Sequence, residues 1–314
     1  YKLRMKSELP ESNWGQALVP EGAVIFENHN GTAPGLAVEK DGKIAILLPG
    51  PPGEMYPMFE EQVCPYIQGK QSGIIRSQMI KICGFGESKV EEMLLDLIDS
   101  QTNPTIATYA KTKEVHIRVT ARAETDEEAK KILKPVVKEI KKRFGNAVYT
   151  TDENETLEDV VVRLLTKYDL TVTTAESCTG GLLAGRLVNV PGASEVFRQG
   201  FITYSNKAKR KQLDVSKTTL RKYGAVSEQT AWEMARGGAK LTEADVCISV
   251  TGYAGPETGE NGEPVGLVYI GCNVKGKIEV EEFHFSWDRK RIRELATVHA
   301  LTFLRRCILE NYQL

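Results

Sequence analysis

Histidine is scarce in this chain, and cysteine forms neither a metal-site pattern nor a disulfide framework. Four of the 314 residues are histidine, and the six cysteines stand apart in apolar segments without a CxxC spacing. Such scattered cysteines are typical of reduced core residues in cytoplasmic proteins, so we expect neither zinc ligands nor disulfides. The four histidines also leave little material for catalysis by a histidine base.

Long apolar runs and an excess of one charge are missing as well. The chain has 41 basic and 42 acidic residues, which argues against a protein built mainly to hold nucleic acid or a membrane surface. No apolar run approaches the ~20 residues of a membrane span, and no signal peptide is visible at the amino end. We therefore expect a cytoplasmic protein with no membrane partner and, from its length, two or three domains.

One short segment gathers a hydroxyl, a carboxylate, a thiol and two glycines. It reads TTAESCTGG (residues 173–181), and it joins a β-branched strand pattern to a helical pattern. Ser177 would then stand at the amino end of a helix, where unpaired backbone N–H groups favour an oxyanion or a phosphate. Gly180 and Gly181 would let the backbone approach a ligand closely. The alternative interpretation is an ordinary helix N-cap.

A second segment supplies candidates for the base that a serine nucleophile needs. It again predicts a strand followed by a helix, with Tyr204, Lys207 and Lys209 near the strand end, and neither segment contains histidine. A Ser/Lys or Ser/Tyr/Lys arrangement is the simplest nucleophile system available, because burial lowers a lysine pKa until the free amine accepts a proton. Cys178 has no basic neighbour in its own segment to make a thiolate, so we prefer Ser177 as the nucleophile.

A third segment follows the apolar strand predicted at residues 246–250. It reads TGYAGP, which places Thr251, Gly252 and Gly255 at the carboxyl end of a strand, where open α/β sheets bind ligands. The backbone N–H groups of these glycines would be available to a phosphate or a carboxamide. Alternating strands and helices with short turns from residue 151 onward predict a three-layer α/β/α fold.

These motifs, in this order, resemble the CinA family. The resemblance rests on AESCTGG (175–181), GFITYSN (200–206), GAVSE (224–228), SVTGYAGP (249–256) and PVG (264–266). It implies that residues 151–314 form an amidase domain of the PncC type. Such domains hydrolyse the carboxamide of nicotinamide mononucleotide (NMN) to nicotinate mononucleotide and ammonia, with no metal or other cofactor.

The resemblance also implies roles for single residues. Ser177 would be the nucleophile, with Tyr204 and Lys209 as its partners and Lys207 as the competing choice of base. The substrate-binding positions would be Thr179, Gly180, Gly181, Asn206, Thr251, Gly252 and Gly255. The expected partner is thus a small-molecule nucleotide, and we expect a homo-oligomer, namely a dimer.

The rest of the chain resembles the two domains that precede the amidase in CinA proteins. Residues 1–73 resemble the later part of a molybdopterin-binding-like (MoaB/MogA-like) α/β domain, and residues 74–150 resemble a small α+β KH-like domain. A complete first domain would act on ADP-ribose as a pyrophosphatase with a divalent metal. Half of the expected site is absent from these residues, so we do not assign that activity.

The KH-like segment raises an alternative function, a nucleotide- or RNA-binding regulator in which the C-terminal domain is only a scaffold. The segment GFGE (residues 84–87) is not the GxxG clamp of KH domains, so we do not expect a nucleic-acid partner. A helix predicted over residues 126–144 carries Lys130, Lys134, Lys138 and other lysines between apolar residues. That pattern is typical of a solvated helix face.

Overall fold

The chain divides into two compact units. The computed structural model describes residues 15, 18–70, 73–259 and 262–312, so parts of the first predicted domain lie outside the described residues. One unit comprises Tyr1–Ile74 with Ala123–Asp126, and the other comprises Ile75–Arg122 with Glu127–Leu314.

The first unit is a three-stranded antiparallel sheet packed on a helical segment. Its elements are β1 (Val24–Phe26), β2 (Gly35–Lys40), β3 (Lys43–Leu47), α1 (Pro52–Met58), the π-helical turn η2 (Phe59–Val63) and α2 (Cys64–Gln68). Phe26, Ala37, Met58 and Val63 form its core. The β2–β3 hairpin turns at an Asp-Gly pair (residues 41–42) with positive φ at both positions, which suits the twist of the flanking strands. The MoaB/MogA-like identity of this unit stays a prediction.

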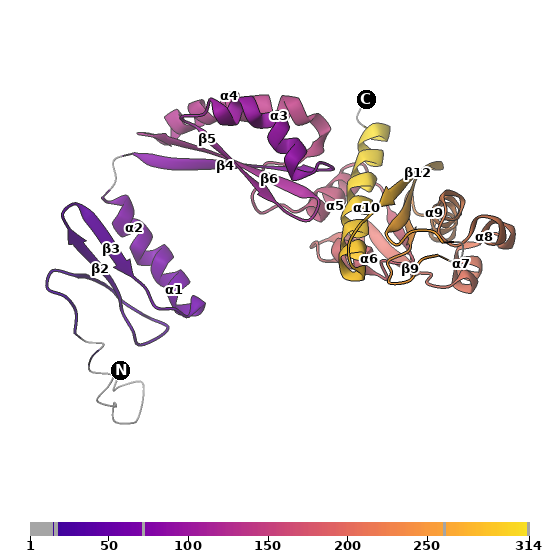
Figure 1. The fold of residues 1–314 in the computed structure, drawn as a ribbon, viewed down its shortest axis with the longest axis horizontal. Coiled ribbons are helices and arrows are strands. Elements are labelled where there is room, and N and C mark those ends of the chain that lie inside the picture. The colour runs from indigo at the N-terminus through magenta and orange to yellow at the C-terminus, as the bar shows by residue number, and fades with distance from the viewer. Residues whose placement is uncertain (1–14, 16–17, 71–72, 260–261, 313–314) are drawn as a thin grey trace. The chain divides into compact units, whose positions relative to one another are not determined.

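The second unit contains a βαββαβ arrangement. Its elements are β4 (Ile74–Cys83), α3 (Glu87–Asp99), β5 (Thr105–Ala110), β6 (Glu114–Ala123), α4 (Asp126–Phe144) and β7 (Val148–Thr150). The sheet order is β5-β6-β4-β7, and α3 and α4 lie together over one face (Figure 1). Helix α4 buries Ala129, Leu133, Val137, Ile140 and Phe144 at helical spacing, which confirms the helix predicted over residues 126–144.

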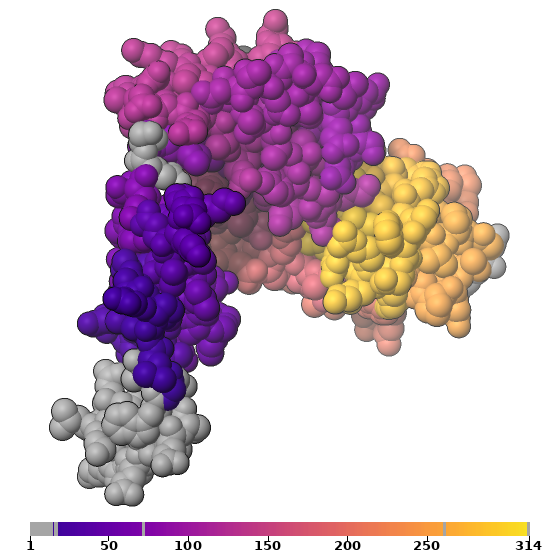
Figure 2. Space-filling view, turned by 60° about the vertical axis from the view of Figure 1, so that its left-hand side comes forward, coloured from indigo at the N-terminus to yellow at the C-terminus, as the bar shows by residue number. Residues whose placement is uncertain are grey.

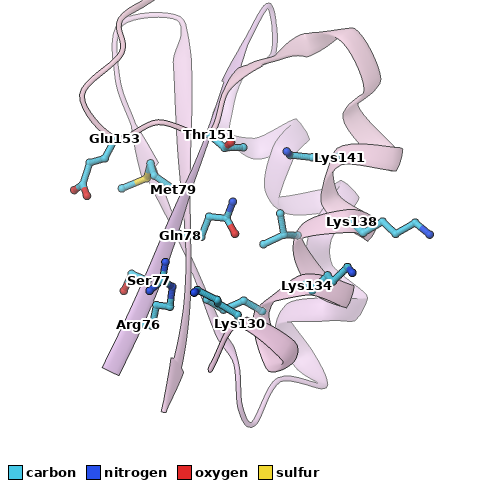
Figure 3. Close-up of a pocket in the computed structure, with 12 residues that line it drawn as sticks. Arg76, Ser77, Gln78, Met79, Lys130, Lys134, Lys138, Lys141, Thr151 and Glu153 are labelled. Atoms are coloured by element: carbon cyan, nitrogen blue, oxygen red, sulfur yellow. The ribbon is translucent and has the colours of Figure 1, made fainter. Parts of the chain in front are cut away.

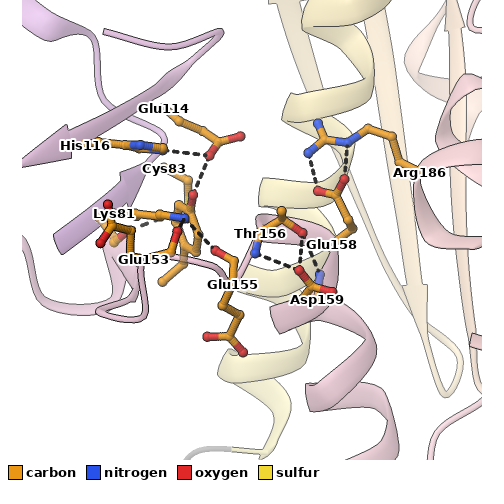
Figure 4. A network of polar contacts seen from close by, with 12 residues as sticks. Lys81, Cys83, Glu114, His116, Glu153, Glu155, Thr156, Glu158, Asp159 and Arg186 are labelled. Carbon is orange, nitrogen blue, oxygen red and sulfur yellow. Dashed lines mark hydrogen bonds and ion pairs between the residues drawn. The ribbon is translucent and has the colours of Figure 1, made fainter. Parts of the chain in front are cut away.

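Strand β7 is short because the chain turns away after Thr150. It pairs with β4 only at Lys81 and Ile82. The Lys81 ammonium then donates to the carbonyl oxygens of Glu153 (2.8 Å) and Glu155 (2.9 Å), as Figure 4 shows. These two hydrogen bonds hold residues 153–155 against the Lys81 side chain. This segment therefore does not continue the strand pairing along β4.

The remaining residues form one α/β domain around a five-stranded sheet. Its elements are α5 (Leu157–Lys167), β8 (Val172–Glu176), α6 (Leu182–Val188), β9 (Phe197–Ile202), α7 (Asn206–Leu213), α8 (Lys217–Tyr223), α9 (Glu228–Thr242), β10 (Val246–Gly252), β11 (Leu267–Val274), β12 (Lys277–His284) and α10 (Arg289–Tyr312). The sheet order is β12-β11-β10-β8-β9. Strands β8, β9 and β10 are parallel, whereas β11 and β12 are antiparallel to their neighbours.

Helices cover both faces of this sheet. Helices α5, α6 and α10 pack together on one face, and α9 packs on the other face with α7 and α8 beside it. This is the predicted three-layer α/β/α fold. Thr156 and Asp159 exchange hydrogen bonds as a capping box at the start of α5 (Figure 4). Within the described residues, no helix combines the length and the apolar character that crossing a bilayer would need.

Helix α10 also contacts the βαββαβ part of the same unit. Arg305 donates to the carbonyl oxygens of Asn146 and Val148, and Arg291 donates to the Thr112 hydroxyl. In the space-filling view, the yellow atoms of α10 border the purple atoms of this part (Figure 2). The closing helix of the α/β domain therefore connects it to the preceding domain.

Candidate active site

Several chain segments meet at one edge of the five-stranded sheet. Strand β8 ends at Glu176, and the register places this residue beside Ile202 of β9 and Val250 of β10. Because β11 and β12 are antiparallel, β11 starts and β12 ends at the same edge, and α10 begins shortly afterwards. The neighbours β9 and β10 lie on opposite sides of β8. The end of β8 is thus a topological switch point, where open α/β sheets bind ligands.

Ser177 and Lys209 contact each other at this switch point. Ser177 directly follows β8, and its backbone N–H donates to the carbonyl oxygen of Val250 (2.9 Å). Lys209 comes from α7, and its Nζ donates to Ser177 Oγ (2.8 Å) and to the carbonyl oxygen of Thr203 (2.8 Å). Ser177 is 8% exposed and Lys209 is 1% exposed. The structure therefore brings together two of the three residues predicted to be catalytic.

Burial lowers the pKa of the Lys209 ammonium group. Desolvation brings this pKa from its ordinary value of 10.5 to about 8, and the Cys178 thiol acts weakly in the opposite direction. A lysine with such a pKa holds a neutral fraction at neutral pH. Its amine can therefore accept a proton from the hydroxyl group 2.8 Å away.

Burial has the opposite effect on the pKa of the thiol beside Ser177, which it raises. Burial is the main cause that raises the pKa of Cys178 to about 11, and Lys209 lowers it only in part. Cys178 is 5% exposed. A thiol in this environment stays protonated at neutral pH, which makes it a poor nucleophile.

The carboxylate of Glu176, the last residue of β8, lies at the amino end of α6. Its carboxylate accepts hydrogen bonds from the backbone N–H groups of Gly181 (2.9 Å), Leu183 (3.1 Å) and Ala184 (2.9 Å). The N–H of Gly180 donates to the carbonyl oxygen of the preceding turn residue, Ser177. The prediction of unpaired N–H groups at this helix end is therefore wrong for Gly180 and Gly181. A fully buried carboxylate satisfies the helix end instead, where it also complements the helix dipole.

The two glycines have a conformational role in this turn. Gly180 and Gly181 have φ angles of 59° and 94°, a region that favours glycine. The N–H groups of Cys178 and Thr179 are the ones left without an acceptor among the described residues, and the buried Thr179 hydroxyl has no partner there either. These two amides are therefore the candidate oxyanion donors.

Replacing Glu176 should weaken the turn strongly. Glu176→Ala would leave three N–H groups at the buried helix end without a partner, and we expect a loss of about 3 kcal/mol in the free energy of unfolding of this domain. Amide hydrogen exchange across residues 181–188 and the thermal unfolding midpoint measure the effect. Glu195→Gln, at an exposed glutamate of the same domain, is the control. Unchanged exchange in Glu176→Ala would contradict the capping role.

Tyr204 lies apart from the Ser177–Lys209 pair. Its side chain is 61% exposed, and its hydroxyl accepts a hydrogen bond from Arg289 Nη2 (2.7 Å). Arg289 Nη1 also donates to the carbonyl oxygen of Gly255 (2.6 Å). Across the described residues, no hydrogen bond joins Tyr204 to Ser177 or Lys209. Tyr204 therefore lies beside the Arg289 guanidinium, at the solvent-exposed rim of the site.

The sequence analysis missed two arginines near the start of α10, Arg289 and Arg293. Besides Arg289, Arg293 reaches this edge and donates to the carbonyl oxygens of Cys178 (2.9 Å) and Thr179 (2.8 Å). The two arginines are four residues apart, so they share one helix face. That spacing, directly after a predicted strand, was the available signal.

The remaining predicted residues lie in different surroundings. Asn206 is exposed at the start of α7, and Lys207 is exposed in a surface hollow between α7 and α8. Thr251 and Gly252 belong to β10, and the buried Thr251 hydroxyl donates to the carbonyl oxygen of Ala225 (2.7 Å). They lie at the carboxyl end of the strand, as predicted, although β10 continues through Gly252 and does not end at residue 250.

The fold and this sheet edge define a class of protein, namely a three-layer α/β protein with a buried serine–lysine pair at its switch point. Two family models match this chain. Residues 154–308 match the CinA C-terminal domain, and residues 77–150 match the KH domain of the damage-inducible protein CinA.

Known relatives match nearly the whole chain. One from Clostridium beijerinckii, which carries the provisional name of a competence-damage inducible protein, is 53% identical over 302 residues, covering 96% of this chain and 73% of the relative. A CinA-like protein of Dictyoglomus thermophilum is 52% identical over 301 residues, with the same coverage of 96% and 73%. The chain therefore belongs to the CinA family.

Solved structures match about half of the chain. The competence damage-inducible protein A (ComA) of Klebsiella pneumoniae is 39% identical, with a TM-score of 0.49, and the match covers 50% of this chain and 97% of that one. A CinA superfamily protein of Escherichia coli is 37% identical, with a TM-score of 0.47, and the match covers 52% and 97%.

Proposed function

We propose that this chain is a nicotinamide mononucleotide amidohydrolase, which converts NMN and water to nicotinate mononucleotide and ammonia. The observation that carries the proposal is the 2.8 Å contact between Lys209 Nζ and Ser177 Oγ at the switch point of the sheet. A serine with a lysine base can perform acyl transfer without histidine. Membership of the CinA family supports the reaction class. Action without a metal, a dimeric state and a cytoplasmic location belong to the same proposal.

The Ser177–Lys209 pair would carry the chemistry in two stages. Neutral Lys209 takes the proton of Ser177, and Oγ attacks the carboxamide carbon of NMN. The tetrahedral intermediate breaks its C–N bond while Lys209 returns the proton to the leaving nitrogen, which departs as ammonia. Water then attacks the acyl ester with Lys209 again as the base, releasing the nicotinate nucleotide and restoring the serine.

The negative charge that develops on the carboxamide oxygen of NMN needs hydrogen-bond donors that are already in place. The N–H groups of Cys178 and Thr179 directly follow the nucleophile and would donate to the oxyanion. Arg293 holds the carbonyl oxygens of both residues, which fixes the orientation of these peptide groups. The oxyanion site is thus held by a residue that need not touch the substrate.

The phosphate of NMN would meet the outer part of the site. Arg289 is exposed there, with its guanidinium held by Tyr204 and Gly255. Guanidinium groups bind phosphate through paired hydrogen bonds. Tyr204 would then position Arg289 and contact the substrate, in place of the proton-transfer role that the family resemblance implies.

The test is ammonia release from three related compounds. The purified chain is incubated separately with NMN, nicotinamide riboside and nicotinamide, and ammonia is measured with a coupled assay. We expect NMN to exceed the other two by at least about tenfold in kcat/KM, because the phosphate supplies binding energy. Equal rates would contradict the phosphate contact, and no release from any of the three would overturn the reaction.

The pKa of Lys209 predicts the pH dependence. Only the neutral amine acts as the base, so kcat/KM should rise roughly tenfold per pH unit below the pKa and level off above it. With the Lys209 pKa at about 8, the rise spans pH 6 to 8. Steady-state assays in overlapping buffers measure it. Activity that falls as pH rises through this range would show that the protonated lysine is required instead.

A further inference from the structure

Helix α7 has two different faces. Lys209 and Leu213 are buried on its inner face. Lys207, Arg210 and Lys211 are exposed, and their spacings of three and four residues place them together on its outer face. A short turn leads from α7 to α8, and both helices pack against α9 (Figure 1). The proposed base and this basic row therefore lie on different faces of one helix.

A hollow lies between α7 and α8. It encloses about 530 Å³, which is within the range of about 300–1,000 Å³ that is usual for small-molecule sites. Its lining contains four cations, namely Lys207, Arg210 and Lys211 from α7 and Lys217 from α8, and one carboxylate, Asp214. Two helices thus contribute positive charge to a space of the size of a small ligand.

The positive charge of this hollow is not neutralised within the protein. None of its four cations makes an ion pair or a side-chain hydrogen bond within the described residues. Other surface cations, such as Lys89 and Arg163, pair with glutamates. The Glu233 carboxylate of α9 accepts from the Ser216 N–H (2.7 Å) and the Thr219 hydroxyl (2.6 Å), so it is already engaged at the start of α8.

The positions of these cations also oppose local helix preferences. Lys207 stands in the first turn of α7 and Lys217 is the first residue of α8, although positive charge is unfavourable at the amino end of a helix. Lys207 and Lys211 are four residues apart and repel each other. Local rules of this kind are broken most often at functional sites. A bound anion would relieve both effects.

The larger groove between β4 and α4 shows no comparable cluster. It encloses about 640 Å³, and lysines of α4 are among its lining residues. Lys130 pairs with Glu127, and Figure 3 shows Lys134 and Lys138 pointing away from the strand. The hollow between α7 and α8 is therefore the better candidate for an anion site.

We propose that the hollow between α7 and α8 binds a chain of linked phosphate groups, such as a triphosphate. Arg210 would form paired hydrogen bonds with phosphate oxygens, and the lysines of the two helices would meet the neighbouring phosphates. A single phosphate would leave most of this charge without a partner. No lining residue is aromatic, so a nucleotide base would have no stacking surface. Inorganic triphosphate and a nucleoside triphosphate should therefore bind alike.

Titration calorimetry with the full chain tests the proposal without any assay of amide hydrolysis. Inorganic triphosphate, ATP, GTP and AMP are titrated separately in a buffer without divalent metal ions, which would neutralise the phosphates. We expect the three triphosphates to bind within about threefold of one another and AMP at least about tenfold more weakly, because the affinity follows the number of charges. Far tighter binding of ATP than of GTP and triphosphate, or equal binding of AMP, would overturn the proposal.

Matched variants locate the site. Lys211→Ala/Lys217→Ala should weaken triphosphate binding by about tenfold, whereas Arg221→Ala/Lys222→Ala, at exposed cations of α8 outside the hollow, should change it less than about twofold. Asp214→Asn should tighten binding about threefold, a gain that a misfolded variant would not give.

The same titrations define the contradicting results. Equal loss in both double variants, or no binding of triphosphate to the unaltered chain, would overturn the proposal. Tighter binding of a ten-nucleotide oligo-dT than of triphosphate would replace the small ligand by a nucleic acid.

Discussion

Ser177→Ala is expected to abolish ammonia release from NMN, with kcat/KM reduced on the order of 10⁴-fold or more. Within the described part of the chain, Ser177 Oγ is the one nucleophilic group that Lys209 Nζ hydrogen-bonds, its other partner being the carbonyl oxygen of Thr203. The fold should persist, because the backbone N–H of residue 177 still donates to Val250 and the buried Glu176 still caps α6. The coupled ammonia assay and circular dichroism measure the two effects.

Cys178→Ala is the matched control for this result. The thiol is adjacent in the chain, but its raised pKa keeps it protonated. The variant should therefore retain most of its activity. Normal activity in Ser177→Ala together with an inactive Cys178→Ala would reverse the assignment of the nucleophile.

Lys209→Ala should have the second largest effect, a loss on the order of 10³-fold in the rate of the chemical step. Single-turnover ammonia release with enzyme in excess measures this step apart from product release. Lys207→Ala is the control, because Lys207 is exposed two residues earlier on the same helix. Its rate should stay close to that of the unaltered chain. A greater loss in Lys207→Ala than in Lys209→Ala would assign the base to Lys207.

Local patterns predict much of the fold. The helical spacing of apolar residues predicts the bounds of α4, and the spacing of Thr156 and Asp159 is that of a capping box, which indicates the start of α5. Strand-to-helix changes around Ser177 and Tyr204 put both segments at the same edge of a sheet, since parallel strands carry their carboxyl ends to one side. These features depend on a few neighbouring residues, so a single sequence contains them.

The sequence alone can favour one of the two candidate bases, Lys207 and Lys209. Lys209 lies four residues before Leu213, and both form the buried stripe of α7. Lys207 falls outside that stripe. The helical period therefore favours Lys209 over Lys207, although only the fold shows that the stripe faces Ser177.

Other features of the site depend on the path of the backbone. Glu176 caps α6 because the turn after β8 curls back over its carboxylate, and no local pattern indicates that curl. Arg289 and Arg293 reach the site from the far end of the domain, since the antiparallel strands return the chain to the same edge. The contact of Arg289 with Tyr204 spans 85 residues. Such contacts need the assembled sheet.

The central claim is that Ser177 forms a covalent acyl intermediate, and peptide mass spectrometry tests it most directly. The chain is mixed with NMN, quenched in acid within the first turnover and digested with trypsin, which releases the peptide of residues 168–186. We predict that this peptide gains the mass of the acyl group of nicotinate mononucleotide, and that fragmentation places the acyl group on Ser177. An acyl group on Cys178, or on any residue outside this peptide, would contradict the assignment.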